Sequence, residues 1–408
     1  MTLPKTLVAV CCNGAVRVVH LYPFVPSGRH GGTLRLAAAV EAAGAIGSPE
    51  VHCFDAAAEG WLHLSSELLA AGLDERDESR PPPPESLKRR LFPSTLWESG
   101  SRARRALDGY ADRLRIDADA LVVLHTSYLA AATHGVAALA RATVVDVYDL
   151  VWRAHRNDAG SAGAPLSAIR WGYSESVRWR ESRELKLPDA LLVAGYDDYS
   201  RLSGRLPAVS WVPTATPVEA VPAPAPADGL LRVGLLGNFA HASTRRSADQ
   251  LLASALAADP SVRVLLAGLH ASAVAAPSTV TEVLGAVSRA EDFYARVDCV
   301  VAPVEGGSGI KCKLGEALLA GRPVITTPLG AAGYPPSIRR HFTICATHEL
   351  DAEVVRRAVA GFDAEVVRAA AQGELGHGAV VGRYAAALAD AVERPARSPH
   401  SAAPRGPR

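Results

Sequence analysis

The chain has 408 residues, which is more than one ordinary hydrophobic core accommodates, so we expect two domains. Hydrophobic residues make up 49% and charged residues 21%, and the formal net charge of +1 excludes a polyanion-coating protein and disfavours nucleic acid as a partner. No apolar run reaches about 18 residues and the N-terminal residues lack a secretion signal, which predicts a cytoplasmic protein without a membrane-spanning helix.

The first half of the chain alternates strand patterns with helix patterns. Strands are expected at Val16–Tyr22, Val51–Asp55, Leu121–Leu124, Thr143–Asp149 and Leu191–Ala194, and helices at Thr33–Ala43 and Tyr128–Ala140. Strand–helix–strand alternation implies a parallel sheet that helices cover on both faces. This half therefore predicts an α/β fold built on a doubly wound parallel sheet.

Between these elements, Gly72–Arg115 is irregular and basic. Its proline run, Pro81–Pro84, is typical of a loop or stiff spacer. Basic side chains follow at Lys88, Arg89, Arg90, Arg102, Arg104 and Arg105. They fit a solvated helix face, and the alternative is a surface for an anionic acceptor or a peripheral contact with the inner face of the membrane.

A segment rich in proline and alanine marks the expected domain junction. Val218–Asp228 lacks hydrophobic periodicity and is typical of a semi-rigid linker, which places the domains at residues 1–217 and 229–394. After it, strands are expected at Leu230–Leu236, Val262–Ala267, Cys299–Pro303 and Val324–Thr327, and helices at Ser247–Ala257 and Ile310–Ala320. This half predicts a second doubly wound domain, whose last helix can pack back on the first. Residues 395–408 are expected to be a disordered tail.

A glycine-rich turn carries the clearest chemical signal. Gly306, Gly307 and Gly309 follow a buried strand, and because they have no Cβ the backbone there can approach a ligand closely. Ser308 is the candidate N-cap of the helix that follows. Free amides at the start of that helix, together with the helix dipole, form an anion site at the carboxyl edge of a parallel sheet.

Two lysines and a glutamate follow the glycines. Most basic residues of this chain are arginines, yet Lys311 and Lys313 stand close together, which indicates a local reason for lysine. Lys311 lies in the first helical turn, where it can add a positive charge to a phosphate. Glu316 shares a helical face with Lys313 and can accept hydrogen bonds from ribose hydroxyls. The alternative is an ordinary loop, with Lys313 and Glu316 as a surface ion pair.

This stretch resembles the donor-binding signature of the glycosyl transferases group 1 family. Its sequence G-G-S-G-I-K-C-K-L-G-E-A-L-L-A-G-R-P-V is similar to the family pattern G-x-G-x-K/R-x-K-x-x-E-A. The resemblance implies the GT-B fold, in which two Rossmann-like domains face each other across a cleft, and sugar transfer with retention. It also implies that Glu316 binds the donor ribose, and that Lys311 and the amides of Gly309 and Ile310 bind its diphosphate. Ser308 stands where the family usually has a first glutamate.

The resemblance implies further donor contacts nearer the start of the second domain. The stretch L-R-V-G-L-L-G-N-F-A-H-A-S-T-R-R-S resembles the strand, glycine turn and basic residue with which that domain opens in the family. Gly237 and Asn238 would then line the cleft, and Arg245 or Arg246 would face the phosphates, with capping or surface roles as the alternative. Val287, just before a helix expected near Glu291–Ala295, is the candidate contact for the base.

In the first domain, the loop Ser27–Thr33 leaves a strand and opens a helix. The resemblance implies that Gly31 and Gly32 in this loop border the cleft and touch the donor phosphate or the acceptor. The alternative is a tight connection between the strand and the helix, which glycine also suits.

The candidate catalytic residues of the first domain follow two strands. His125 ends a strand at the carboxyl edge, where ligands bind, and a structural role is its alternative. After the next strand the family often has His-Asp, and this chain has Tyr148-Asp149. Asp149 or Asp146 is therefore the candidate for contacting an acceptor hydroxyl or orienting a base.

The predicted function is transfer of a sugar from a nucleoside diphosphate, expected to be UDP or GDP, to a small-molecule, glycan or lipid-linked acceptor. By the resemblance the leaving diphosphate takes the acceptor proton, and Lys311 stabilises the charge that develops on it. No residues show metal-ligand spacing, so we predict neither a metal nor a cofactor. The alternatives are a non-catalytic nucleotide-sugar-binding protein and a sugar-nucleotide epimerase. A dehydrogenase is disfavoured because G-x-G-x-x-G is missing after the first strand.

Overall fold

A computed structural model describes residues 16–26, 31–56, 58–65, 68–69, 102–103, 105–107, 110, 113–160, 163, 165–206, 208–222, 224, 229–274 and 280–394. The proline run Pro81–Pro84, most of the basic stretch around it and the tail at residues 395–408 lie outside the described residues. The first part of the glycine loop, at residues 27–30, does so too.

The first sheet has seven strands in the order β3-β2-β1-β4-β5-β6-β7. The strands are β1 Val16–Tyr22, β2 Gly47–Asp55, β3 Gly60–Leu64, β4 Ala120–His125, β5 Ala142–Val147, β6 Ala190–Val193 and β7 Val209–Trp211. Every neighbouring pair is parallel except β2 and β3, which are antiparallel. The antiparallel edge strand β3 follows a turn that the strand–helix alternation of the sequence did not indicate.

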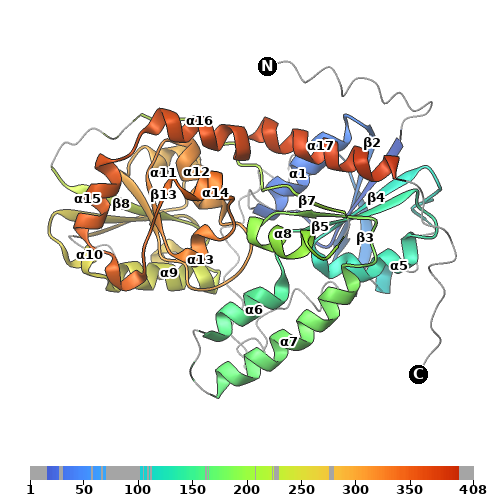
Figure 1. The fold of residues 1–408 in the computed structure, drawn as a ribbon, viewed down its shortest axis with the longest axis horizontal. Coiled ribbons are helices and arrows are strands. Elements are labelled where there is room, and N and C mark those ends of the chain that lie inside the picture. The colour runs from blue at the N-terminus through green and yellow to red at the C-terminus, as the bar shows by residue number, and fades with distance from the viewer. Residues whose placement is uncertain are drawn as a thin grey trace.

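The helices of this half are α1 Gly31–Ala43, η2 Ser127–Ala132, α5 Thr133–Val136, α6 Val151–Gly160, α7 Leu166–Glu184 and α8 Tyr196–Ser203. The continuous helix predicted at Tyr128–Ala140 is wrong, because a 3₁₀ helix and one short α-helix take its place. The alanine-rich part forms the 3₁₀ helix and the low-propensity residues Thr133–Val136 form the α-helix, so intrinsic propensity does not decide the helix type here. Helices α6 and α7 pack on each other as a hairpin that projects from the body of the molecule (Figure 1).

The second sheet has six parallel strands in the order β10-β9-β8-β11-β12-β13. They are β8 Leu231–Leu236, β9 Val262–Ala267, β10 Thr281–Gly285, β11 Cys299–Ala302, β12 Val324–Thr326 and β13 Phe342–Ile344. The helices are α9 Ala242–Ala253, α10 Ala255–Ala258, η3 Ala271–Ala273, α11 Ala290–Tyr294, α12 Cys312–Leu319, α13 Pro328–Ala331, α14 Pro336–Arg339, η4 Thr347–Glu349, α15 Ala352–Ala360, α16 Ala364–Leu375 and α17 His377–Glu393. The α/β class with two Rossmann-like parallel-sheet domains is confirmed.

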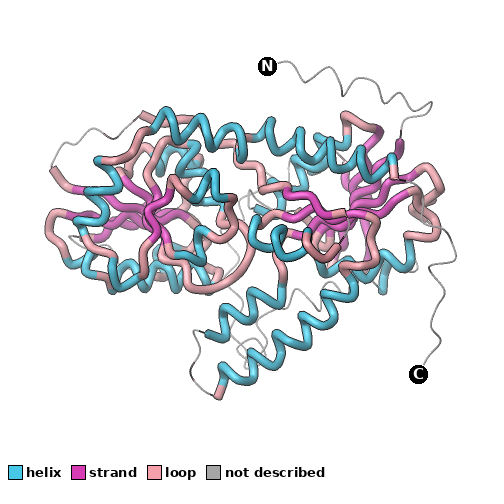
Figure 2. The backbone as a smooth tube through the Cα atoms, in the orientation of Figure 1, coloured by secondary structure: helices cyan, strands magenta, loops and turns pink. Residues whose placement is uncertain are grey.

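Both sheets reverse their direction of growth at one strand, which positions the site. The chain adds β2 on one side of β1 and β4 on the other, and it adds β9 and β11 on opposite sides of β8. A crevice opens at the carboxyl ends of the strands at each of these switch points. Figure 2 shows the two groups of strands side by side, with loops between them.

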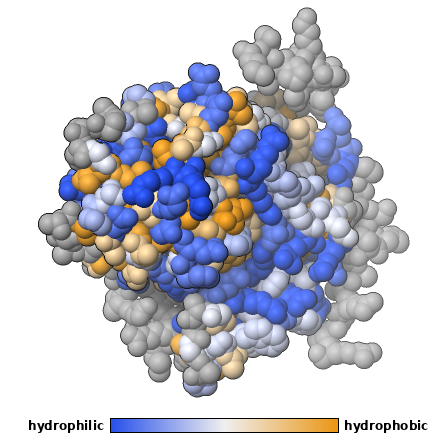
Figure 3. All heavy atoms as spheres, turned by 60° about the vertical axis from the view of Figure 1, so that its left-hand side comes forward, coloured by the Kyte–Doolittle hydropathy of each residue, from blue (hydrophilic) through white to orange (hydrophobic). Residues whose placement is uncertain are grey.

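Two further observations concern the hydrophobicity of the helices and of the surface. Among the described residues, no helix is both long and apolar enough to cross a membrane. On the side that carries the second domain, hydrophobic and hydrophilic residues are interspersed (Figure 3).

The last helix, α17, leaves the second half and packs against α1 of the first (Figure 1). Its Tyr384 hydroxyl donates to Asp146 Oδ2 at 2.9 Å, at the end of β5. Asp146 also pairs with Arg35 of α1, whose Nε donates to Oδ1 at 2.9 Å, and all three side chains are fully buried. Burial opposes ionisation of Asp146, but the charge and hydrogen bonds of Arg35 hold its pKa below the ordinary value. One buried ion pair therefore joins α1, α17 and the first sheet.

This arrangement predicts that Asp146→Asn destabilises the protein strongly, because it leaves the Arg35 guanidinium buried without an anion. Breaking a buried pair costs about 3–5 kcal/mol. Asp390→Asn, an exposed change on the same helix α17, should alter the unfolding free energy by less than about 0.5 kcal/mol. Urea unfolding of both variants measures the difference. Equal losses would show that the pair does not hold the helix.

Candidate active site

The loop between β11 and α12 reaches across to the first domain. Gly307 and Gly309 have φ of 79° and 67°, the left-handed region that glycine adopts without strain. Ser308 Oγ donates to Asp149 Oδ2 of the first domain at 3.1 Å. The expected capping role of Ser308 is wrong, because α12 begins only at Cys312 and Lys311 takes the N-cap position. Ser308 is instead a contact between the two domains.

The starts of two helices meet across the cleft. A Cβ built on Gly31, the first residue of α1, would lie 3.2 Å from Cys312 Sγ at the first residue of α12. The next residue, Gly32, accepts a hydrogen bond from the Tyr148 hydroxyl at 3.3 Å. Both helices thus present their N-terminal amides to one space, and such amides favour an anion. The structure brings Gly31 next to the start of α12. Contact of Gly31 and Gly32 with a donor phosphate or an acceptor stays a prediction.

Lys311 and Lys313 are half-buried beside this space. The Lys311 ammonium donates to the carbonyls of Ser308 and Gly309, so it lies within its own loop. Burial lowers the pKa of Lys311, and the nearby Asp149 opposes that shift. For Lys313, burial and the charge of Lys311 lower the pKa to about 8. Lys313 Nζ lies 3.2 Å from the position a Cβ would take on Gly237, so the glycine turn after β8 borders the same space.

The Glu316 side chain bonds to Tyr294 rather than to Lys313, its neighbour on the same helix. It is half-buried and accepts a hydrogen bond from the Tyr294 hydroxyl at 3.0 Å. Burial raises its pKa, while the hydrogen bond from Tyr294 and the charge of Lys313 oppose that shift. Within the described residues, Lys313 and Glu316 form no ion pair. Glu316 keeps acceptor capacity for hydroxyl groups, which suits the ribose role that the resemblance implies.

The remaining donor candidates lie around this space to different degrees. Asn238 follows Gly237, and its side-chain oxygen accepts from the Ala240 amide at 2.9 Å, so it shapes the turn. Arg245 is half-buried in α9, while its neighbour Arg246 reaches Asp158 of the first domain at 3.4 Å. Val287 lies in the loop between β10 and α11 and packs against the core of the second domain. Its contact with a base stays a prediction.

His125 lies inside the first domain. Its Nδ1 is 3.2 Å from Asp146 Oδ2 and 3.2 Å from the Tyr148 hydroxyl, and its Nε2 is 3.0 Å from His20 Nδ1. An ionised Asp146 carboxylate can only accept, so Nδ1 of His125 donates to it. The His125 side chain is fully buried, and the Tyr148 hydroxyl connects it to Gly32 at the start of α1. Its catalytic role stays a prediction, and the structure gives it a place behind the site.

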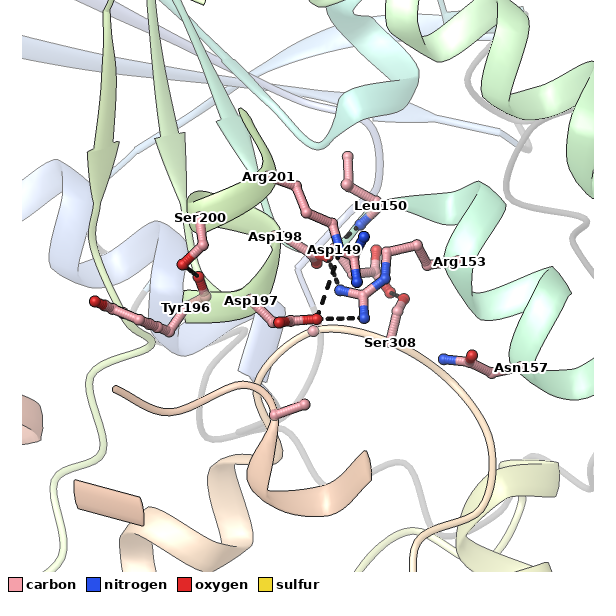
Figure 4. A network of polar contacts seen from close by, with 12 residues as sticks. Asp149, Leu150, Arg153, Asn157, Tyr196, Asp197, Asp198, Ser200, Arg201 and Ser308 are labelled. Carbon is pink, nitrogen blue, oxygen red and sulfur yellow. Dashed lines mark hydrogen bonds and ion pairs between the residues drawn. The ribbon is translucent and has the colours of Figure 1, made fainter. Parts of the chain in front are cut away.

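Asp149 lies at the cleft, in contrast. It is half-buried beside Ser308, and burial and the negative charge of Asp198 raise its pKa. Figure 4 shows Asp149 and Ser308 next to Arg153, whose guanidinium lies between the carboxylates of Asp197 and Asp198. The hollow at this place is lined from both domains, by Arg153, Gly195, Asp197, Asp198, Ser308, Gly309, Leu329, Ala332 and Gly333. The first-domain carboxylates that line this hollow are Asp197 and Asp198, and Asp149 lies next to it through its bond to Ser308. The contact of Asp149 with an acceptor stays a prediction.

Several residues of this cluster were not indicated by the sequence. Arg153, Asn157 and Asp158 of α6 lie in a segment without a recognisable motif, and their partners are far away in the chain. Asp197 and Asp198 stand out as an adjacent acidic pair, but nothing local shows that they bind an arginine. Within the described residues, no group of His, Cys, Asp and Glu is arranged to hold a metal ion.

Part of the sequence and the overall fold are similar to those of known proteins. Residues 231–359 match the family described as Glycosyl transferases group 1, and no curated protein matches the chain. The fold is similar to that of sucrose-phosphate synthase from Thermosynechococcus elongatus, at 15% identity, 92% coverage of this chain and 98% of that chain, with a TM-score of 0.61. It is also similar to that of Alr3699/HepE of Anabaena in complex with UDP-glucose, at 13% identity, 92% coverage of this chain and 99% of that chain, with a TM-score of 0.56. For trehalose-6-phosphate synthase OtsA the identity is 12%, the coverage 93% of this chain and 100% of that chain, and the TM-score 0.57.

One buried carboxyl predicts a pH effect on stability. Glu181 of α7 accepts from the amides of Val151 and Trp152, the first residues of α6, at 3.3 and 3.4 Å. Burial raises its pKa from 4.5 to about 8, against the effect of these hydrogen bonds. A raised pKa means that the folded state holds the proton more tightly. The stability that protonated Glu181 contributes to the fold is therefore complete below pH 4.5 and is lost as the pH rises to about 8.

The unfolding free energy of the wild type, minus that of Glu181→Gln, should fall by about 1.4 kcal/mol per pH unit across this window. Above pH 8 the difference should level off. Urea unfolding at a series of pH values measures it. A difference that does not change with pH would mean that Glu181 titrates as an ordinary carboxyl.

Proposed function

We propose that this chain, which has the GT-B fold and matches the glycosyl transferases group 1 family over residues 231–359, transfers a sugar from a nucleoside diphosphate sugar to an acceptor hydroxyl. One observation supports this most: the starts of α1 and α12 meet where Gly31 approaches Cys312, with Lys311 and Lys313 beside them. Two sets of helix amides and two ammonium groups suit a diphosphate that gains charge as its bond to the sugar breaks.

The proposed reaction needs little from protein acids and bases. The bond between the sugar carbon and the diphosphate oxygen breaks, the acceptor oxygen bonds to that carbon, and the acceptor proton passes to the leaving phosphate oxygen. Lys311 and the loop amides stabilise the charge on the diphosphate, and Glu316 holds the ribose. Asp149 orients the acceptor hydroxyl, because it lies at the cleft while His125 lies behind it. We propose that the sugar keeps its anomeric configuration.

The finer features of the reaction also belong to the proposal. We propose that it proceeds without a metal or a cofactor, that the donor carries UDP or GDP, and that the acceptor is a small molecule, a glycan or a lipid-linked sugar. The solved structure of Alr3699/HepE contains UDP-glucose, which supports a uridine donor as the first to test. Proton NMR of the product reports the anomeric configuration, and activity in excess EDTA reports the need for a metal. We further propose a cytoplasmic location, with peripheral contact to the inner face of the membrane as the alternative.

Thermal unfolding in the presence of UDP-, GDP-, ADP- and dTDP-sugars tests the proposal directly. At a ligand concentration of 100 times Kd, binding stabilises the protein by about 2.7 kcal/mol. The double variant Lys311→Ala, Glu316→Ala should lose this shift, whereas Lys186→Ala, an exposed change after α7, should keep it. No shift with any sugar nucleotide, or the same shift in the double variant, would refute the donor site.

Donor binding should also depend on pH through Lys313. Its pKa of about 8 in the free protein rises when a diphosphate approaches, so binding takes up a proton above that pH. The affinity should be constant well below pH 8 and fall by up to tenfold per pH unit above it. Lys313→Arg keeps its charge throughout and should remove this dependence. Calorimetry between pH 6.5 and about 9 measures both proteins, and identical pH profiles would contradict the role of Lys313.

A further inference from the structure

The last turns of α6, in the first domain, bind the loop between β11 and α12 of the second domain. Asn157 Nδ2 donates to the Gly307 carbonyl at 2.7 Å. The carboxylate of its neighbour Asp158 accepts from the Gly307 amide at 3.3 Å and from Arg246 Nη1 at 3.4 Å. Arg246 comes from α9, so a first-domain carboxylate lies between an amide and a guanidinium of the second domain.

The backbone around this carboxylate fits the arrangement closely. A Cβ built on Gly306 would lie 2.5 Å from Arg246 Nη1 and 2.5 Å from Asp158 Oδ1, so both side chains pack directly over that residue. Gly307 turns its amide toward Asp158 from a left-handed conformation. The side chains of Arg246 and Asp158 are 27% and 24% exposed, which makes this a partly shielded pair rather than a loose surface contact.

The Gly307 amide and the Arg246 guanidinium, which contact the Asp158 carboxylate, are both kinds of group that bind a phosphate oxygen. Backbone amides at a glycine turn and a guanidinium are common partners of anions. Lys311 and Lys313 lie on the same loop and on the helix that follows it, so a diphosphate drawn to them brings its negative charge toward Asp158. A carboxylate and a diphosphate cannot share these partners without mutual repulsion.

We propose that Asp158 is a positioning residue whose carboxylate stands in for a donor phosphate oxygen. It keeps Arg246 and the Gly307 amide arranged for an anion while the cleft is empty, and the incoming diphosphate displaces it. Because Asp158 belongs to α6, its release loosens the hold of the α6–α7 hairpin on the second domain. This inference rests on the proposed donor site, and it adds a residue that the first domain contributes to donor affinity.

Donor affinity of Asp158→Asn tests the inference, with a double-mutant cycle through Arg246→Gln. Removing the competing charge should lower the Kd for the sugar nucleotide about fivefold, because the binding free energy gained is comparable to that of one partly exposed ion pair. Arg246→Gln should raise the Kd, and in that background Asp158→Asn should change it less than about twofold. Glu175→Gln, which removes a carboxylate that pairs with Arg156 and Arg178 in the same hairpin, should leave the Kd unchanged.

A Kd for Asp158→Asn that equals or exceeds that of the wild type would overturn the competition, and so would a full gain in the Arg246→Gln background. Hydrogen exchange of the wild type provides a second measurement that needs no variant. The donor should protect residues 306–311 and speed exchange at residues 155–160, and protection of both segments would also overturn the inference. Inorganic pyrophosphate serves as a second probe. If it shifts exchange in this way while no sugar nucleotide binds, the proposed function fails and the competition at Asp158 stands.

Discussion

The structure depends on a loop that is stabilised by the domain it does not belong to. Between β11 and α12 the loop is held by three first-domain residues: Asn157 and Asp158 bond to the Gly307 backbone, and Asp149 accepts from the Ser308 hydroxyl. Three glycines let this loop lie so close that Gly309 approaches Gly195 of the first domain. An anion that enters the cleft must therefore use amides whose orientation is set jointly by both halves of the chain. Donor binding and domain arrangement are one equilibrium in such a design.

The first domain supports its side of the cleft through buried polar groups. Asp146 fixes Arg35 of α1 and the proton position on His125, and Tyr148 connects that group to Gly32 at the start of α1. In a low-dielectric interior, an unpaired member of such a hydrogen-bond network costs free energy, so each side chain restricts the positions of the others. The helix that presents amides to the cleft is consequently held in place by its side chains as well as by packing. Rigid support of this kind keeps a site ordered before its ligand arrives.

The fold could be predicted, and candidate donor-binding residues could be named, because their signals are local. Strand–helix alternation gave the two parallel sheets, and the glycines, lysines and glutamate between Gly306 and Glu316 lie within one short segment. The contacts of Arg153, Asp158 and Ser308 could not be predicted, because each partner lies 44 or more residues away. Ser308 looked like a helix cap for the same reason: its true partner, Asp149, belongs to the other domain. The antiparallel β3 followed no periodic signal.

The path of α17 has a consequence for recombining this protein with its relatives. Chain order assigns the helix to the second domain, but its Tyr384 is buried in the first domain, and Arg141 of the first domain donates to the Val392 carbonyl near the end of the same helix. A chimera joined only at the connector before β8 would pair one parent's helix with the other parent's sheet. A second crossover after α16, near Gly376, would return the helix to its native neighbours. The two domains can therefore be exchanged only when the first domain and α17 come from the same parent.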